Sequence, residues 1–361
     1  MNRLLGRWLL VLLAAGCGAR TGLDEPPLER LDATGPPPFD AGTFTTFPCR
    51  WTLGVAAELG PGAPLAELAG AVHPTRDEAV VVVSGAPVER PGAVVSIAAS
   101  GRVLERVESP RAALFAADVG YALQAPGACG VELRDARFTP TGRAGWDGVS
   151  CALTQSVVGR VESVDSTGAV RSLTGLDGAT VDRLVATTGP APDDVFAFHD
   201  EATDTTLIAR LDGRRLRLER HVDGRVEPFD VSVAADGMSA AADPLRGGMM
   251  VHYRDAADGW RLEHFDWEAG RWPETHFDVS GLPEPAGPIA TNETEILVPL
   301  VDGRIAYIPF ALVTLMVRWV DPVDGGDVER MHIVLRPNGS AGGVVYENRG
   351  AVWFQPLVCN R

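Results

Sequence analysis

The chain has 361 residues, and 45% of them are hydrophobic, which is enough apolar material for a substantial buried core. Its formal net charge is −16, and all 32 basic residues are Arg, so electrostatics argues against nucleic acid or an anionic membrane as a partner of its surface. The 40 Gly and 27 Pro are typical of a turn-rich all-β protein and not of a helical one.

The first 17 residues, MNRLLGRWLLVLLAAGC, have the pattern of an export signal. Arg3 and Arg7 flank a short apolar run, and small residues precede Cys17. Because the run is shorter than the ~20 residues that span a bilayer, we expect cleavage and not a membrane span. The segment resembles the lipobox of bacterial lipoproteins, with Ala14 at the position where Leu fits best. The alternative is an ordinary signal peptide with a chance Cys.

The lipobox resemblance implies that residues 1–16 are removed and that Cys17 is acylated, with palmitate-type chains holding the mature protein on a membrane. Gly18 follows the Cys, where lipoproteins retained in the inner membrane often carry Asp. We therefore expect export and lipid anchoring at the bacterial cell envelope, with the outer membrane favoured.

Residues 17–48 comprise this Cys and a Pro- and Gly-rich segment. Such a composition predicts a disordered tether, with the alternative that residues 44–47 pack on the domain that follows. Fully extended, 31 residues reach roughly 100 Å.

Residues 49–361 alternate short β-rich runs with Gly turns. Asp-Gly and Asn-Gly pairs favour type I′ hairpins, because both central residues need positive φ. The turns are expected at Ser100-Gly101, Thr167-Gly168, Asp212-Gly213, Asp223-Gly224, Asp258-Gly259, Asp302-Gly303, Asn338-Gly339 and Arg349-Gly350.

The spacing of these turns predicts the fold. From Gly168 through 213 and 259 to Gly303 the intervals are 45, 46 and 44 residues, whereas the interval from Gly101 to Gly168 is 67. A further turn at Thr141-Gly142 would divide that longer interval. A period near 45 residues predicts a single β-propeller of six or seven four-stranded blades from residue 49 to 361. The alternative is a pair of tandem β-sandwiches.

Two segments resemble known bacterial repeats. VHPTRDEAVVVV, from Val72 to Val83, is similar to the entry of YVTN or TolB-type blades. TGPAPDDVFAF, from Thr188 to Phe198, resembles the entry of another bacterial propeller repeat, with Phe196 where Trp is usual. Both resemblances support the architecture and imply no activity.

The five Cys include four beyond Cys17, an even number in an exported chain. In a propeller whose N-terminal strand completes the last blade, residues 50–55 would lie antiparallel to residues 351–358, which places Cys49 beside Cys359. Cys129 then pairs with Cys151, within one blade or between neighbours. The alternative is four buried free thiols.

Recognisable catalytic and cofactor motifs are absent: the sequence has no HExxH, GxSxG, P-loop, GxGxxG or CxxC pattern. It therefore predicts no cofactor and no catalytic residue, and the question of enzymatic activity stays open, with a non-enzyme favoured. An acid-rich run offers a weak Ca²⁺ candidate without EF-hand spacing, for which a solvated turn is the simpler interpretation. Its carboxylates are Asp321, Asp324, Asp327 and Glu329.

Aromatic residues are the better candidates for ligand contact. Trp260, Trp267 and Trp272 lie close together in sequence and could stack on a sugar or peptide, with packing in the core as the alternative. We expect a binding or scaffold module that takes an envelope protein, peptide or glycan. The alternative is a hydrolase or lyase that acts on polysaccharide or peptide in the central channel.

Overall fold

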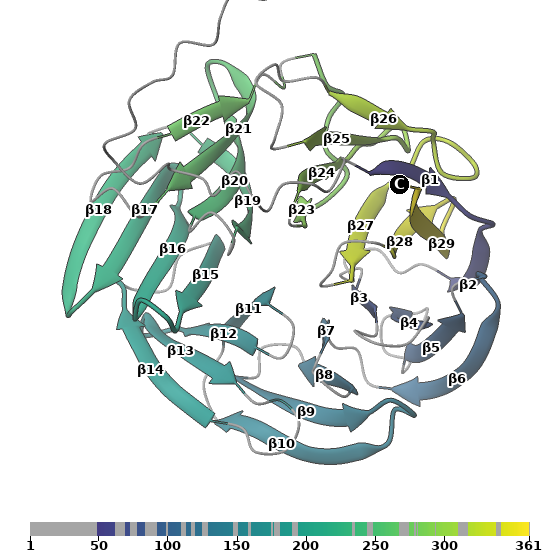
Figure 1. The fold of residues 1–361 in the computed structure, drawn as a ribbon, viewed down its shortest axis with the longest axis horizontal. Coiled ribbons are helices and arrows are strands. Elements are labelled where there is room, and N and C mark those ends of the chain that lie inside the picture. The colour runs from purple at the N-terminus through teal and green to yellow at the C-terminus, as the bar shows by residue number, and fades with distance from the viewer. Residues whose placement is uncertain are drawn as a thin grey trace, which may run out of the picture. The chain divides into compact units, whose positions relative to one another are not determined.

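Seven antiparallel sheets surround a common axis (Figure 1). The structure is a computed structural model, and it describes residues 49–360 except 62–68, 73–77, 84–91, 99, 110–112, 117–119, 125–128, 147–150, 158–159, 175, 177–180, 190–193, 233–234, 244–247, 267–273, 278, 280, 293, 310–316 and 337–340. These residues contain strands and no helix, so none of them forms a helix long and apolar enough to cross a membrane.

Each sheet is one blade, and the blades follow one another in chain order. Blade 1 consists of β3 (Ala69–Val72), β4 (Glu78–Val83), β5 (Gly92–Ala98) and β6 (Val103–Ser109). Blade 2 consists of β7 (Ala113–Ala116), β8 (Gly120–Gln124), β9 (Cys129–Asp135) and β10 (Pro140–Trp146). Blade 3 consists of β11 (Cys151–Val157), β12 (Arg160–Asp165), β13 (Ala169–Thr174) and β14 (Val181–Thr187).

Blade 4 consists of β15 (Asp194–Asp200), β16 (Thr205–Asp212), β17 (Arg215–Val222) and β18 (Arg225–Ser232). Blade 5 consists of β19 (Ala235–Asp243), β20 (Gly248–Asp255), β21 (Gly259–Asp266) and β22 (Glu274–Phe277). Blade 6 consists of β23 (Ala290–Thr291), β24 (Glu295–Pro299), β25 (Ile305–Pro309) and β26 (Arg318–Val320).

Blade 7 joins the two ends of the described chain. Its strands β27 (Arg330–Leu335), β28 (Ala341–Asn348) and β29 (Ala351–Asn360) are completed by β1 (Arg50–Leu53) and β2 (Ala57–Pro61), which both pair with β29. The ring is therefore closed by its N-terminal segment, as predicted. The fold is a seven-bladed propeller, and the sandwich alternative is wrong because the seven sheets form one ring (Figure 1).

Both predicted disulfides are present. Cys49 is bonded to Cys359 with Cα atoms 5.1 Å apart, since Trp51 stands opposite Cys359 in the pairing of β1 with β29. Cys129 is bonded to Cys151 with Cα atoms 4.9 Å apart. That second bond joins β9 of blade 2 to β11 of blade 3, so it lies between neighbouring blades.

The turn rhythm arises from one equivalent turn in successive blades. Gly168, Gly213, Gly259 and Gly303 each connect the second and third strands of blades 3 to 6, whereas Gly101 connects the third and fourth strands of blade 1. The interval of 67 residues from Gly101 to Gly168 therefore separates two turns at different positions in their blades. The expected turn at Thr141-Gly142 is wrong, because both residues lie inside β10, where Gly142 pairs with Leu133 of β9.

The type I′ expectation holds at only two of the predicted turns that the structure describes. Both central residues have positive φ at Asp223-Gly224 and at Arg349-Gly350. At Thr167-Gly168 only the Gly does, with φ +85°, and the side chain of Asp165 closes that turn by accepting the amides of Thr167 and Ala169. The side chain of Asp165 thus stabilises a turn in which only one residue has positive φ.

Candidate functional site

The interface between blades 3 and 4 contains a group of buried polar and charged side chains among the described residues. Among the described residues, its apolar cluster has six buried members, against thirteen between blades 4 and 5. We call its polar residues the blade 3–4 seam; they are Arg160, Glu162, Arg183, Thr188, His199, Asp204, Thr206, Arg210, Glu219 and His221.

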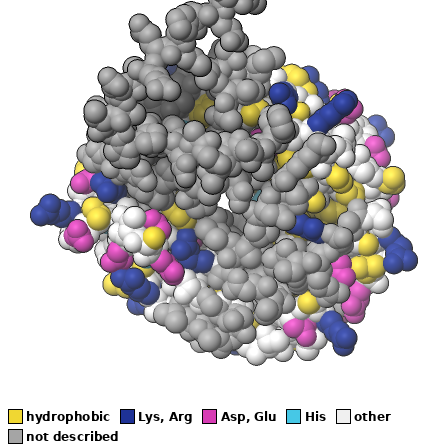
Figure 2. Space-filling model, viewed as in Figure 1, with side chains coloured by type: hydrophobic (Ala, Val, Ile, Leu, Met, Phe, Trp, Pro, Cys, Tyr) yellow, Lys and Arg dark blue, Asp and Glu magenta, His cyan; other side chains and the backbone are white. Residues whose placement is uncertain are grey.

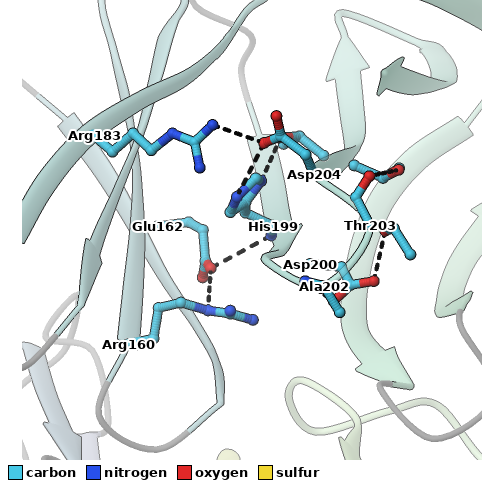
Figure 3. Close-up of polar contacts among 10 residues, drawn as sticks. Arg160, Glu162, Arg183, His199, Asp200, Ala202, Thr203 and Asp204 are labelled. Carbon is cyan, nitrogen blue, oxygen red and sulfur yellow. Dashed lines mark hydrogen bonds and ion pairs between the residues drawn. The ribbon is translucent and has the colours of Figure 1, made fainter. Parts of the chain in front are cut away.

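One end of the seam is centred on His199, the next-to-last residue of β15 (Figure 3). Its Nδ1 lies 3.0 Å from the hydroxyl of Thr206, and its Nε2 lies 3.8 Å from the carboxylate of Asp204. Asp204 also accepts a hydrogen bond of 2.9 Å from Arg183 of blade 3. Asp204, in the first turn of blade 4, therefore links the imidazole to the outer strand of blade 3.

A buried carboxylate contacts the backbone of His199. Glu162 of β12 is fully buried, accepts the backbone amide of His199 at 3.4 Å and is paired with Arg160 at 3.0 Å (Figure 3). Burial lowers the pKa of His199, and the positive charges of Arg160 and Arg183 lower it further. His199 is therefore neutral at neutral pH.

The other end of the seam is centred on Glu219 of β17. Its carboxylate accepts the hydroxyl of Thr188 at 2.9 Å and lies 2.9 Å from Nε2 of His221. Arg210 contacts the same hydroxyl and forms a two-pronged ion pair with Asp212. Burial alone would raise the pKa of Glu219, but the hydrogen bonds and the charge of Arg210 lower it, so the carboxylate stays ionised.

This arrangement holds two blades together and is poorly suited to catalysis. A Thr hydroxyl, an imidazole and a carboxylate are close together, but Thr206 and His199 are each only 1% exposed. A substrate cannot reach a nucleophile that is buried to this extent. No sequence motif marks these residues: charged and His residues alternate along the strands, and the alternation does not show which of them are enclosed between blades.

Trp260, the first of the three predicted stacking residues, is half-buried in β21. Its ring stacks on His252 of the neighbouring strand with centroids 4.8 Å apart, and it packs against the apolar cluster between blades 5 and 6. Internal contacts thus occupy this indole, which favours the core interpretation. Trp267 and Trp272 lie outside the described residues, so a stacking role for them stays a prediction.

Hydrogen bonds with side chains of blade 7 hold the backbone of the acid-rich loop between blades 6 and 7. Gln355 accepts the amide of Asp324, Tyr346 donates to the carbonyl of Asp324, and Asn348 donates to the carbonyl of Asp327. The four predicted calcium ligands, Asp321, Asp324, Asp327 and Glu329, are all exposed. No group of three or more His, Cys, Asp or Glu able to hold a metal ion occurs in the described part of the chain, so the four do not form a ligand set there.

Some apolar side chains remain exposed on the propeller. Trp319 of β26 is 42% exposed, and the guanidinium of Arg304 lies 4.2 Å from its ring centroid. Val55, between β1 and β2, is 75% exposed. Basic and acidic side chains are intermixed around the rim (Figure 2).

Comparisons with known proteins point to the fold alone. No protein-family model and no curated protein matches this chain. Among solved structures, the chain is similar to the WD40 domain of Toxoplasma gondii coronin, with a TM-score of 0.56, 10% identity and coverage of 85% of this chain and 87% of that one.

Two further propellers are similar. The β-propeller domain of Myceliophteria thermophila Cps50 (Swd1) has a TM-score of 0.55, 11% identity and coverage of 83% of this chain and 99% of that one. BBS1N, solved in complex with ARL6DN, has a TM-score of 0.55, 10% identity and coverage of 87% and 98%. At such identities the similarity establishes the β-propeller fold and nothing about activity.

Proposed function

We propose that this chain is a lipid-anchored envelope protein whose propeller serves as a binding or scaffold module. The observation that carries the proposal is the WD40-like ring, which aligns with solved propellers over 83–87% of the chain. One of these propellers was solved in complex with another protein, which supports a binding role for the architecture. The partner is a protein, peptide or glycan of the envelope.

The burial of the blade 3–4 seam supports binding over catalysis. An acid–base or nucleophilic site must be open to its substrate, whereas the described Thr–His and His–Glu pairs of this seam lie between two packed blades. A hydrolase or lyase would need an exposed set of such groups at the channel or on a loop face.

The start of the sequence supports the anchor. We propose that residues 1–16 form the signal peptide, that Cys17 carries the acyl chains, and that residues up to 48 tether the propeller. Gly18 favours the outer membrane. The bacterial propeller repeats that residues 72–83 and 188–198 resemble are in keeping with a bacterial envelope protein.

Metabolic labelling with a fatty-acid analogue tests the anchor. We expect the wild-type protein to carry the label and Cys17→Ser to lack it, because only a Cys thiol at this position accepts the lipid. A mature chain found free in the periplasm with an unmodified Cys17 would contradict the proposal.

Pull-down from solubilised envelope tests the binding role. We expect one stoichiometric partner, and we expect the Cys17→Ser form to capture the same partner, because binding resides in the propeller and not in the lipid. A chain that captures nothing and hydrolyses polysaccharide or peptide would instead favour the enzyme.

A further inference from the structure

The closing strand β1 is held by strand pairing and a disulfide on one side and by a side-chain hydrogen bond on the other. On one side, β1 pairs with β29 and is cross-linked to it through Cys49 and Cys359. On its other side lies blade 6, whose Glu295 reaches the same strand. The contact joins residues 244 positions apart in the chain.

Glu295 is the first residue of β24 and is fully buried. Its Oε2 accepts the indole N–H of Trp51 at 2.6 Å. Asn292 fixes the backbone below it by accepting the amides of Thr294 and Glu295, each at 2.8 Å. The carboxyl group is thus aimed at the closing strand by a rigid turn.

The surroundings of this contact are apolar. Trp51 and Cys49 are each 3% exposed and belong to the same buried cluster as blade 6 residues. The blade 6 members of that cluster are Leu297, Ile305, Tyr307 and Val320. Water is therefore excluded, and a hydrogen bond in such surroundings is strong, while an unpaired partner is costly.

We propose that Glu295 is a second lock on the ring, which holds the closing strand to blade 6 independently of the disulfide. Separating β1 from blade 6 would remove the Trp51 donor from a fully buried carboxyl group. The propeller should consequently stay closed when the Cys49–Cys359 bond is absent. Glu295 acts here as a positioning residue for the strand.

Burial raises the pKa of Glu295, and the hydrogen bond from Trp51 and the charge of Arg318 oppose this effect. Either protonation state keeps an oxygen that accepts the indole N–H. The lock therefore depends on the acceptor and not on the charge, which distinguishes Glu295→Gln from Glu295→Ala.

Hydrogen exchange in the full-length chain tests the lock. Cys49→Ser with Cys359→Ser removes the closure disulfide and leaves Cys129–Cys151 intact. In this background we expect the amides of residues 50–53 to stay protected. Adding Trp51→Phe, which keeps the ring and removes the donor, should speed their exchange at least tenfold while blades 2 to 5 remain unchanged. Glu295→Ala should act likewise, and Glu295→Gln should restore protection.

Tyr253→Phe is the matched control, because Tyr253 donates a hydrogen bond of 3.0 Å to buried Glu263 within blade 5. We expect it to leave residues 50–53 protected. If the Trp51→Phe combination fails to fold while this control folds, the ring depends on the lock, which also supports the proposal. The proposal is overturned if residues 50–53 exchange equally fast in the disulfide-free background with and without Trp51→Phe.

Discussion

Two histidines of this propeller have a pKa well below the ordinary value of a His side chain. His252 of β20 is 2% exposed and stacks on Trp260, and burial lowers its pKa to about 4. Burial also lowers the pKa of His332 of β27 to about 4. These imidazoles stay neutral in the folded chain, whereas in the unfolded chain they take up protons near their ordinary pKa of about 6.5.

His252→Phe tests this linkage. Between the folded pKa of about 4 and the ordinary value, the unfolded chain binds more protons, so the stability of the wild type falls as the pH falls. For His252 alone the loss between about pH 7 and about pH 4.5 should be roughly 2 kcal/mol. The variant keeps an aromatic ring against Trp260. Over the same pH range, its free energy of unfolding in urea should fall by that much less than the free energy of the wild type. An identical pH dependence in both proteins would contradict the assignment.

At the scale of the element, the turns determine how each blade is connected. Gly168 and Gly224 both have positive φ, yet their surroundings differ. A Cβ on Gly168 would collide with backbone carbonyls after β14, including that of Thr188 at 2.6 Å, whereas a Cβ on Gly224 would have nothing within 4 Å. The first turn packs against the next connection, and the second faces open space.

Replacing each of these glycines by Ala separates backbone strain from crowding. Gly224→Ala should cost about 1 kcal/mol, because an L residue is strained at positive φ. Gly168→Ala carries the same strain and in addition pushes two segments apart, so we expect a loss of about 3 kcal/mol or more. Equal losses of stability for the two variants in denaturant unfolding would contradict this, because they would show that the connection after β14 moves aside at no cost.

At the scale of the whole molecule, the two disulfides close loops of very different length. Cys49–Cys359 has a sequence separation of 310, and Cys129–Cys151 has a separation of 22. The long loop encloses the entire ring, and the short one joins blade 2 to blade 3. Their contributions to stability should therefore differ, even though the bonds are chemically alike.

Replacing each pair by Ser measures this difference. The chain-entropy model predicts losses of roughly 6 kcal/mol for the closure bond and roughly 3 kcal/mol for the short bond. The second lock at Glu295 keeps the ring closed in the folded state. The loss of stability on removing the closure bond therefore arises from the greater conformational freedom of the unfolded chain. Denaturant unfolding of the two double variants provides the comparison, and a larger loss for Cys129→Ser with Cys151→Ser would contradict it.

The propeller architecture and its closure could be predicted from residue patterns because both depend on local chemistry. Gly recurs where a hairpin between the second and third strands of a blade needs positive φ, and this recurs about every 45 residues. The Gly spacing read from Gly101 fits six or seven blades, because Gly101 belongs to a different turn, the one between the third and fourth strands of blade 1.

The candidate site could not be predicted in the same way. Glu162 and His199, like Trp51 and Glu295, are far apart in the chain and meet only because neighbouring blades pack face to face. Nothing in the local pattern distinguishes a buried Glu that receives a donor from a neighbouring blade from one that faces solvent.

The sequence by itself determined the strand period, the turns and the pairing of cysteines at the two ends of a ring, since these follow from φ preferences and chain connectivity. Only the tertiary structure decided which polar side chains are enclosed. Burial depends on the packing of blades that are separate in sequence, and burial is what makes the blade 3–4 seam and the Glu295 contact strong.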